Sequence, residues 1–110
     1  MTDQPDQPTE QASSEAIVAA LSSVEHPEIA ATLVDLGMVR DIQYDEASNT
    51  ASLILVLPFF GIPQNVRDYM VYSLYQSIKP YGVEFKVGLA EMTEEERQAF
   101  FVKEKELWRF

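Results

Sequence analysis

The chain has 110 residues, of which 46% are hydrophobic and 24% charged, the composition of an ordinary globular domain. Acidic residues outnumber basic residues by 18 to 8, so the formal net charge is −10. A surface this acidic repels phosphate groups, which argues against binding to nucleic acid or to an anionic membrane. With no cysteine and one histidine, His26, the chain by itself cannot form disulfides, cysteine-ligated zinc sites or cysteine-ligated clusters.

Residues 1–13 are predicted to be a disordered acidic tail, and residues 14–110 a single domain. The tail is rich in Gln, Pro, Asp, Thr and Ser and has no aliphatic side chain after Met1 that could anchor it. It has neither the positive charge nor the apolar stretch of a signal peptide. The longest apolar run, residues 53–62, is too short to span a bilayer. We therefore expect a cytoplasmic location.

The first predicted helix covers residues 14–24, where apolar residues recur at helical spacing. It ends before Pro27, because the residue before a proline avoids the helical region. Residues 29–34 form a short connection, and Gly37 supplies the permissive backbone of a tight turn.

Three strands are predicted from alternating side chains, at residues 38–44, 50–57 and 83–87. Residues 45–49 have the composition of a turn, so the first two strands should form an antiparallel hairpin. The second strand is apolar on both faces, which indicates a central position in the sheet.

A second helix is predicted from Pro63 or Gln64 to Lys79. A third is predicted to begin after Thr93, which starts a Thr-x-x-Glu capping box, and to run to about residue 107. The element order is then α-β-β-α-β-α. We expect an α/β (α+β) two-layer sandwich, with a small mixed three-stranded sheet and helices mainly on one face.

His26, Glu28 and Asp35 are the candidates for a hard metal site or an acid–base pair. We favour a simpler interpretation, in which His26 is an exposed or capping histidine in a loop. The side chain of Asp35, two residues before Gly37, is expected to hold a turn.

Two aromatic clusters are candidates for interaction surfaces. Phe59 and Phe60 follow the central strand, where ligands bind in many α/β domains. They form either an apolar docking surface or part of the core, and the sequence does not separate these alternatives. Tyr72, Tyr75 and Trp108 could form a protein–protein surface. We favour internal cover, in which the last helix packs over the tyrosines.

Three short segments resemble the metal–sulfur cluster biosynthesis, or iron–sulfur cluster assembly, family, which includes the PaaD-like and SufT-type proteins. The segments are His26-Pro27-Glu28-Ile29, then Asp35-Leu36-Gly37-Met38-Val39, then Gly61-Ile62-Pro63. The family pattern is Asp-Pro-Glu-Ile, then Asp-Leu-Gly-Leu-Val, then Thr-x-Pro-x-Cys-Pro. The resemblance covers about residues 15–100 and implies the fold predicted above.

The chain departs from this pattern at three polar positions. His26 stands in place of Asp, Pro58 in place of Thr, and Ile62 in place of Cys. Those positions are the usual candidates for handling metal or cluster, and an isoleucine offers no ligand to iron. The resemblance therefore implies the fold more strongly than the chemistry.

The resemblance implies an accessory or adaptor protein of iron–sulfur cluster assembly that acts through protein contacts. Its partner would be the assembly machinery or a client protein. The sequence also leaves the formation of a homodimer undecided. The alternative is a non-catalytic module on the same fold that binds a protein or ligand and is unrelated to clusters. No phosphate loop or catalytic triad signature is present. We therefore expect no enzyme activity, no cofactor and no bound metal.

Overall fold

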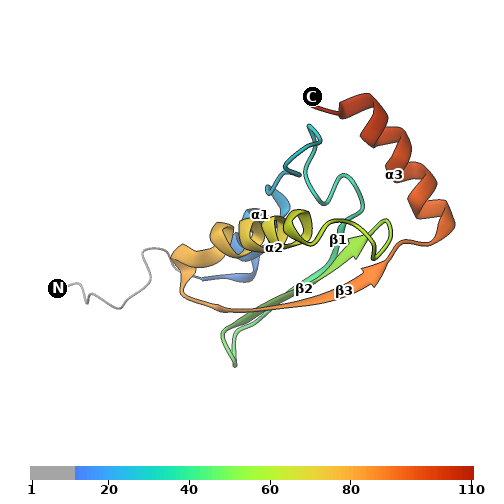
Figure 1. The fold of residues 1–110 in the computed structure, drawn as a ribbon. Helices are drawn as coiled ribbons and strands as arrows, with labels where there is room; N and C mark the ends of the chain where they lie inside the picture. Colours follow the sequence, from blue (N-terminus) through green and yellow to red (C-terminus); the bar gives the residue numbers. More distant parts are fainter. Residues whose placement is uncertain (1–11) are drawn as a thin grey trace.

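A computed structural model describes residues 12–110 of the chain, so residues 1–11 of the predicted tail lie outside the described residues. The elements occur in the predicted order, and the small α+β fold is confirmed (Figure 1). They are α1 (Ser14–Ser22), β1 (Val39–Asp45), β2 (Thr50–Leu57), α2 (Gln64–Ile78), the 3₁₀ turn η1 (Lys79–Tyr81), β3 (Glu84–Glu91) and α3 (Glu94–Leu107).

The sheet has the strand order β1-β2-β3, so β2 is central as its two apolar faces predicted. β1 pairs with β2 antiparallel, and β2 pairs with β3 parallel along its whole length. β3 is longer than the predicted strand at 83–87 because this pairing continues to Leu57 and Glu91. Alternation fails beyond Val87, where Gly88, Leu89 and Ala90 interrupt the pattern of apolar and charged residues.

β1 contains an irregularity that alternation does not predict. Its register against β2 shifts between Arg40 and Gln43, as in a β-bulge. Asp41 lies at the bulge with φ of 57°, a left-handed conformation that aspartate tolerates better than most residues. The tight turn before β1 is as predicted, since Gly37 has φ of 73°.

α1 and α2 lie side by side over one face of the sheet (Figure 1). Their inward side chains, including Ile17, Leu21, Met70 and Leu74, are buried together with Leu55 of β2. This apolar layer is the core of the domain. None of the helices in the described residues has the length and hydrophobicity needed to cross a bilayer.

α3 lies beyond the carboxyl ends of β2 and β3 (Figure 1). Its predicted capping box forms, with the Thr93 hydroxyl accepting from the Glu96 N–H and the Glu96 carboxylate accepting from the Thr93 N–H. Its other end is fixed to the connection after α1, because the Ala30 N–H donates to the Leu107 carbonyl over 2.8 Å. That connection forms isolated bridges and turns.

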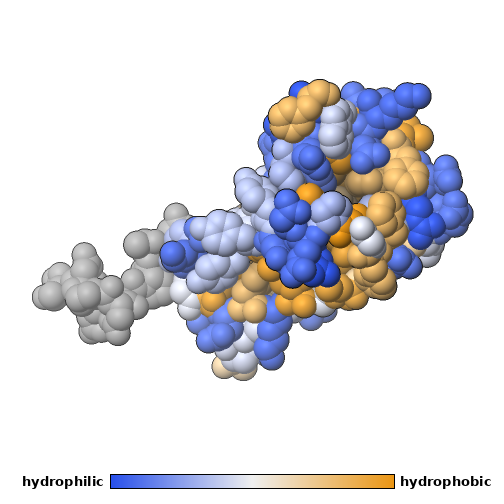
Figure 2. All heavy atoms as spheres, viewed as in Figure 1, coloured by the Kyte–Doolittle hydropathy of each residue, from blue (hydrophilic) through white to orange (hydrophobic). Residues whose placement is uncertain are grey.

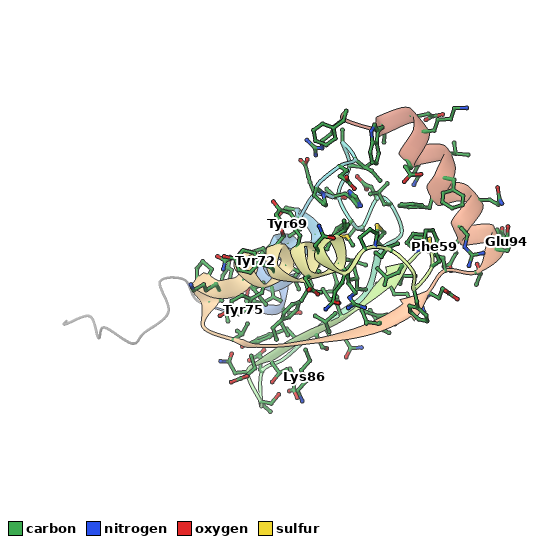
Figure 3. All side chains as sticks on the ribbon, in the orientation of Figure 1. Phe59, Tyr69, Tyr72, Tyr75, Lys86 and Glu94 are labelled. Atoms are coloured by element: carbon green, nitrogen blue, oxygen red, sulfur yellow. The ribbon has the colours of Figure 1, made fainter. Side chains whose placement is uncertain are left out.

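The expectation that α3 covers the tyrosines is wrong. Tyr69, Tyr72 and Tyr75 lie on the outer side of α2, and all three are exposed (Figure 3). α3 packs instead beside residues 28–37, where Lys103 donates to the Asp35 carbonyl over 2.6 Å. The reason is that the connection after α1 offers its own apolar residues to Phe100, the buried side chain of α3.

Candidate functional site

A cavity of about 340 Å³ opens where the loop after β2 meets the start of α2, the His26 loop and α3. Most of its wall is apolar, and aromatic side chains come from two separate segments. The lining residues are His26, Glu28, Met38, Pro58, Phe59, Ile62, Pro63, Val66, Phe100, Phe101 and Glu104.

The three positions at which the chain departs from the family pattern meet in this cavity. His26, Pro58 and Ile62 are far apart in the sequence, yet all three line it. Glu28 and Pro63, which match the pattern, line it as well. The fold therefore assembles one site from residues of all three resembling segments, since Met38 of the second segment lines the cavity as well.

Three other residues of the second segment lie next to this site. Asp35, Leu36 and Gly37 line a separate depression of about 310 Å³, and Phe100 forms part of the wall of both hollows. Pro27 belongs to the His26 loop but does not line the cavity, and Gly61 lies in the exposed loop after β2. Tyr72, Tyr75 and Trp108 are likewise absent from the cavity wall; Trp108 pairs with Ile29 in an isolated bridge.

His26 lies in a loop, as the sequence interpretation held, but it caps no helix and is not exposed. Only 6% of its surface is accessible. Its Nδ1 accepts a 2.9 Å hydrogen bond from the Glu28 N–H, which places the proton of the neutral ring on Nε2. Burial, followed by the positive charge of Arg109, lowers the pKa of His26 from 6.5 to about 4. The ring is therefore neutral at pH 7.

The side chain of Asp35 does not hold the turn, contrary to expectation. Thr32 holds it, because its hydroxyl accepts a 3.1 Å hydrogen bond from the Asp35 N–H. The Asp35 side chain is exposed and has no hydrogen bond or ion pair with the described residues. Among residues 12–110, no group of three or more His, Asp or Glu side chains is arranged to hold a metal ion.

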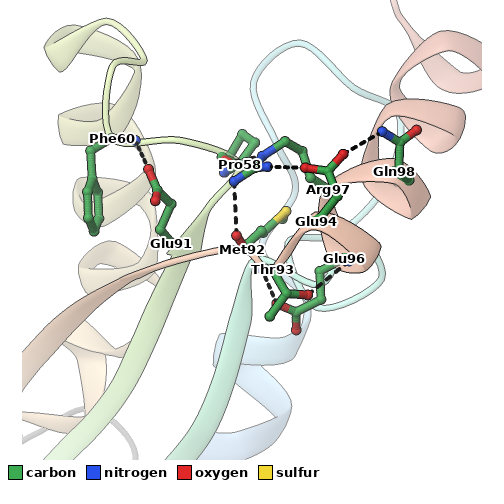
Figure 4. A network of polar contacts seen from close by, with 9 residues as sticks. All are labelled: Pro58, Phe60, Glu91, Met92, Thr93, Glu94, Glu96, Arg97 and Gln98. Carbon is green, nitrogen blue, oxygen red and sulfur yellow. Dashed lines mark hydrogen bonds and ion pairs between the residues drawn. The ribbon is translucent and has the colours of Figure 1, made fainter.

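The loop after β2 is fixed by two charged side chains (Figure 4). Arg97 Nε donates to the Pro58 carbonyl over 2.7 Å, and its Nη2 donates to the Met92 carbonyl over 3.1 Å. The Phe60 N–H donates to the Glu91 carboxylate over 3.0 Å. These bonds join the ends of β2 and β3 to the start of α3, and they position one wall of the cavity.

Phe59 and Phe60 are exposed, by 43% and 55%, so they are not part of the core. Hydrophobic side chains gather on the surface between this loop and α3 (Figure 2). Phe59 and Phe101 each form part of the cavity wall and also contribute to this surface. The structure thus favours an apolar surface around the cavity mouth over the packed alternative.

Two carboxylates line the otherwise apolar cavity. Neither Glu28 nor Glu104 makes a side-chain hydrogen bond or ion pair with the described residues. The neighbouring arginines are paired elsewhere, Arg97 with Glu94 and Arg109 with Glu25. The cavity therefore combines apolar walls with two carboxylates that have no ion-pair partner among the described residues.

Sequence reasoning missed Arg97 and Glu104. An arginine in the first turns of a helix is typical of a solvent-exposed surface. The residues next to Arg97 in the sequence do not indicate that its side chain bonds to the Pro58 and Met92 carbonyl oxygens. Glu104 belongs to a run of alternating charges in α3 that suggests only a solvated helix face. Neither position carries a signal that could have placed it at the site.

The fold and the site define a small α+β domain with an apolar cavity at the carboxyl end of its central strand. Residues 14–87 match the sequence model of a family described as iron–sulfur cluster assembly protein. Because the match covers more than half of the chain, the protein belongs to this family.

A solved structure gives the same fold. It is described as the crystal structure of a domain of unknown function, DUF59, from Bacillus anthracis, and it is 23% identical in sequence. The match has a TM-score of 0.56 and covers 81% of this chain and 89% of the other. Comparison with curated protein sequences gave no significant match.

Proposed function

We propose that this protein is an accessory or adaptor of iron–sulfur cluster assembly that works by binding other proteins and does not hold the cluster itself. Family membership supports the general role. One observation supports the adaptor mechanism: the three departures from the family pattern line a single cavity, and two of them, Pro58 and Ile62, place apolar side chains where the pattern has Thr and Cys. Cluster transfer requires soft thiolate ligands, and the chain has no cysteine to supply them.

The surface around the cavity suits protein contacts. Binding surfaces between proteins are rich in aromatic side chains set in or beside a pocket. Phe59, Phe60 and Phe101 provide such side chains at the cavity mouth. The partner would be a component of the assembly machinery or a client protein that receives a cluster. We propose no catalytic step, because the adaptor role needs only binding.

Binding and maturation assays test this function. The full chain is immobilised and exposed to the purified assembly scaffold, the carriers and an apo-client from the same organism. We expect saturable binding to one of them, weakened by a Phe59→Ser/Phe60→Ser double variant and unchanged by Tyr72→Ser on the outer side of α2. Cluster loading of the client should be faster with the wild-type chain present.

Two results would contradict the proposal. One is the absence of both binding and any effect on loading. The other is stoichiometric iron and sulfide on the isolated chain after anaerobic reconstitution. The cavity itself favours one second candidate, a ligand-binding module unrelated to clusters, because 340 Å³ lies within the size range of small-molecule sites. Cavity binding without any response to the assembly proteins would favour that candidate.

A further inference from the structure

The cavity has three properties that together specify what can occupy it. Its walls are apolar and partly aromatic, its two carboxylates are unpaired, and its histidine is almost fully buried. At about 340 Å³ it is at the small end of the range for binding sites, which is roughly 300–1,000 Å³. This volume suits one or two side chains better than a long ligand.

The charge of the site favours a basic occupant. Glu28 and Glu104 line the cavity without an ion pair to any described cation, and the whole chain has a net charge of −10. An acidic ligand would be repelled at long range and would leave these carboxylates partly desolvated without compensation. A lysine or arginine beside the cavity would pair with them instead.

His26 adds a directional contact. Its Nδ1 is occupied by the Glu28 N–H, so Nε2 carries the ring proton, and this N–H has no hydrogen-bond partner among the described residues. Because no buried side-chain polar atom of the described residues lacks a partner, this N–H is open to solvent in the cavity, where a carbonyl oxygen from a bound segment can accept from it in place of water. The backbone of a protein segment presents such an oxygen at every residue.

We infer that the cavity receives an apolar side chain from a segment of a partner protein that carries a lysine or arginine within a few residues of it. Phe59, Ile62 and Phe101 contact the apolar side chain, Glu28 and Glu104 pair with the basic residue, and His26 donates to a backbone carbonyl. This inference rests on the proposed function, because it describes how the same site would bind a protein of the assembly machinery or a client.

Selection from random peptides tests the inference without assuming a partner. A phage library of random dodecapeptides is selected on the immobilised full chain, and the consensus is synthesised with blocked ends. We expect enrichment of an apolar residue flanked by Lys or Arg, and chemical-shift changes at the amides of Glu28, Ile62 and Phe101 when the peptide binds. Affinity should fall as salt increases, since the charged pairs are near the surface.

Variants separate specific from general binding. Ile62→Trp fills the cavity and should abolish binding, while Glu104→Gln should weaken it about threefold, the effect of one surface charge pair. Glu106→Gln, an exposed glutamate on the same helix outside the cavity wall, is the matched control and should bind as wild type. If Ile62→Trp does not fold, Glu28→Gln/Glu104→Gln replaces it, with an expected loss of about tenfold.

Several outcomes would overturn the inference. These are no enrichment at all, a consensus without a basic residue, equal losses for Glu104→Gln and Glu106→Gln, or shift changes on the tyrosine side of α2. If the amide chemical shifts of the cavity residues change with protein concentration in the absence of peptide, the occupant is a second copy of the chain. If native mass spectra show a retained small molecule, the occupant is that ligand. Peptide binding without association with assembly proteins would support the inference and refute the proposed function. Association with assembly proteins without binding to basic peptides would support the proposed function and refute the inference.

Discussion

Arg97 of α3 and Pro58 at the end of β2 are joined by a 2.7 Å hydrogen bond from Nε to the carbonyl oxygen. The same guanidinium reaches the Met92 carbonyl and the Glu94 carboxylate, so one side chain joins the loop after β2, the segment between β3 and α3, and the first turn of α3 (Figure 4). Pro58 is itself buried and lines the cavity. The position of the cavity wall therefore depends on a residue outside it.

Replacing Arg97→Gln should destabilise the fold by about 2 kcal/mol, because hydrogen bonds to a charged group are worth about 1.5–3 kcal/mol. Urea denaturation measures the loss. Arg67→Gln is the matched control, since Arg67 lies near its sequence neighbour Asp68 in a surface pair, and it should change stability by less than about 0.5 kcal/mol. Equal effects of the two substitutions would show that Arg97 does not fix the loop.

Replacing Phe100 or Phe101 by alanine should lower the stability of the fold by very different amounts. Phe100 is 4% exposed, so Phe100→Ala should cost about 3 kcal/mol through lost burial and a new void. Phe101 is 37% exposed, and Phe101→Ala should cost about 1 kcal/mol or less. Thermal and urea unfolding of the two variants checks the ranking, which would be reversed if α3 packed through its other side.

His26 should make the fold less stable in mild acid. Its pKa is about 4 in the folded chain against 6.5 when unfolded, so between these values the unfolded chain binds the proton and the folded chain does not. The contribution of the neutral His26 ring to the free energy of unfolding is complete above pH 6.5 and is lost as the pH falls toward 4. From pH 7 to 4.5 the His26 contribution should fall by about 2 kcal/mol.

The variant His26→Asn isolates this effect, because Oδ1 of asparagine can accept from the Glu28 N–H in place of Nδ1 and does not titrate. Its stability should change less with pH than that of wild type over this interval, measured by urea denaturation at each pH. Identical pH profiles for the two proteins would mean that His26 titrates normally in the folded state.

Restoring the cysteine of the family pattern with Ile62→Cys should not give a stable cluster in a monomer. One thiolate leaves most of the iron coordination unfilled, since clusters are normally held by four ligands. Anaerobic reconstitution followed by visible absorption and iron and sulfide analysis decides the point. A charge-transfer band with stoichiometric iron and sulfide would contradict the prediction, and the wild-type chain serves as the control.

Amide hydrogen exchange should be slowest in β2, because a central strand opens last. β1 should exchange faster, as it lies at the edge and contains the irregularity at Asp41. The exchange rates are measured by NMR under native conditions. Slower exchange in β1 than in β2 would be inconsistent with the observed strand order.

The sequence predicted those features that depend on neighbouring residues. The two apolar faces of residues 50–57 placed β2 in the centre, and the Thr-x-x-Glu pattern located the start of α3. The bulge at Asp41 was not predictable, because its polar neighbours fit an exposed edge strand with or without it. Local patterns specify local hydrogen bonds and strand faces, and they were sufficient for the fold.

The site was only partly predictable for a different reason. The resembling segments identified His26, Pro58 and Ile62, which do meet in one cavity. They could not reveal Glu104 or Phe101, which reach the cavity because α3 packs beside the connection after α1. The apolar and aromatic residues of α2 suggested cover on more than one side, yet its tyrosines are exposed, so the prediction of α3 over them failed.

The two edges of the sheet differ in their capacity to pair with another chain. The bulge in β1 breaks the regular spacing of its backbone groups, whereas β3 runs for eight residues with no strand on its outer edge in the described part of the chain. Near neutral pH the net charge of −10 keeps copies apart. At the isoelectric point of about 4.3 that repulsion disappears, in the same acidic range in which protonation of His26 favours unfolding. Edge-to-edge aggregation through β3 is therefore the expected fate of this protein in acid.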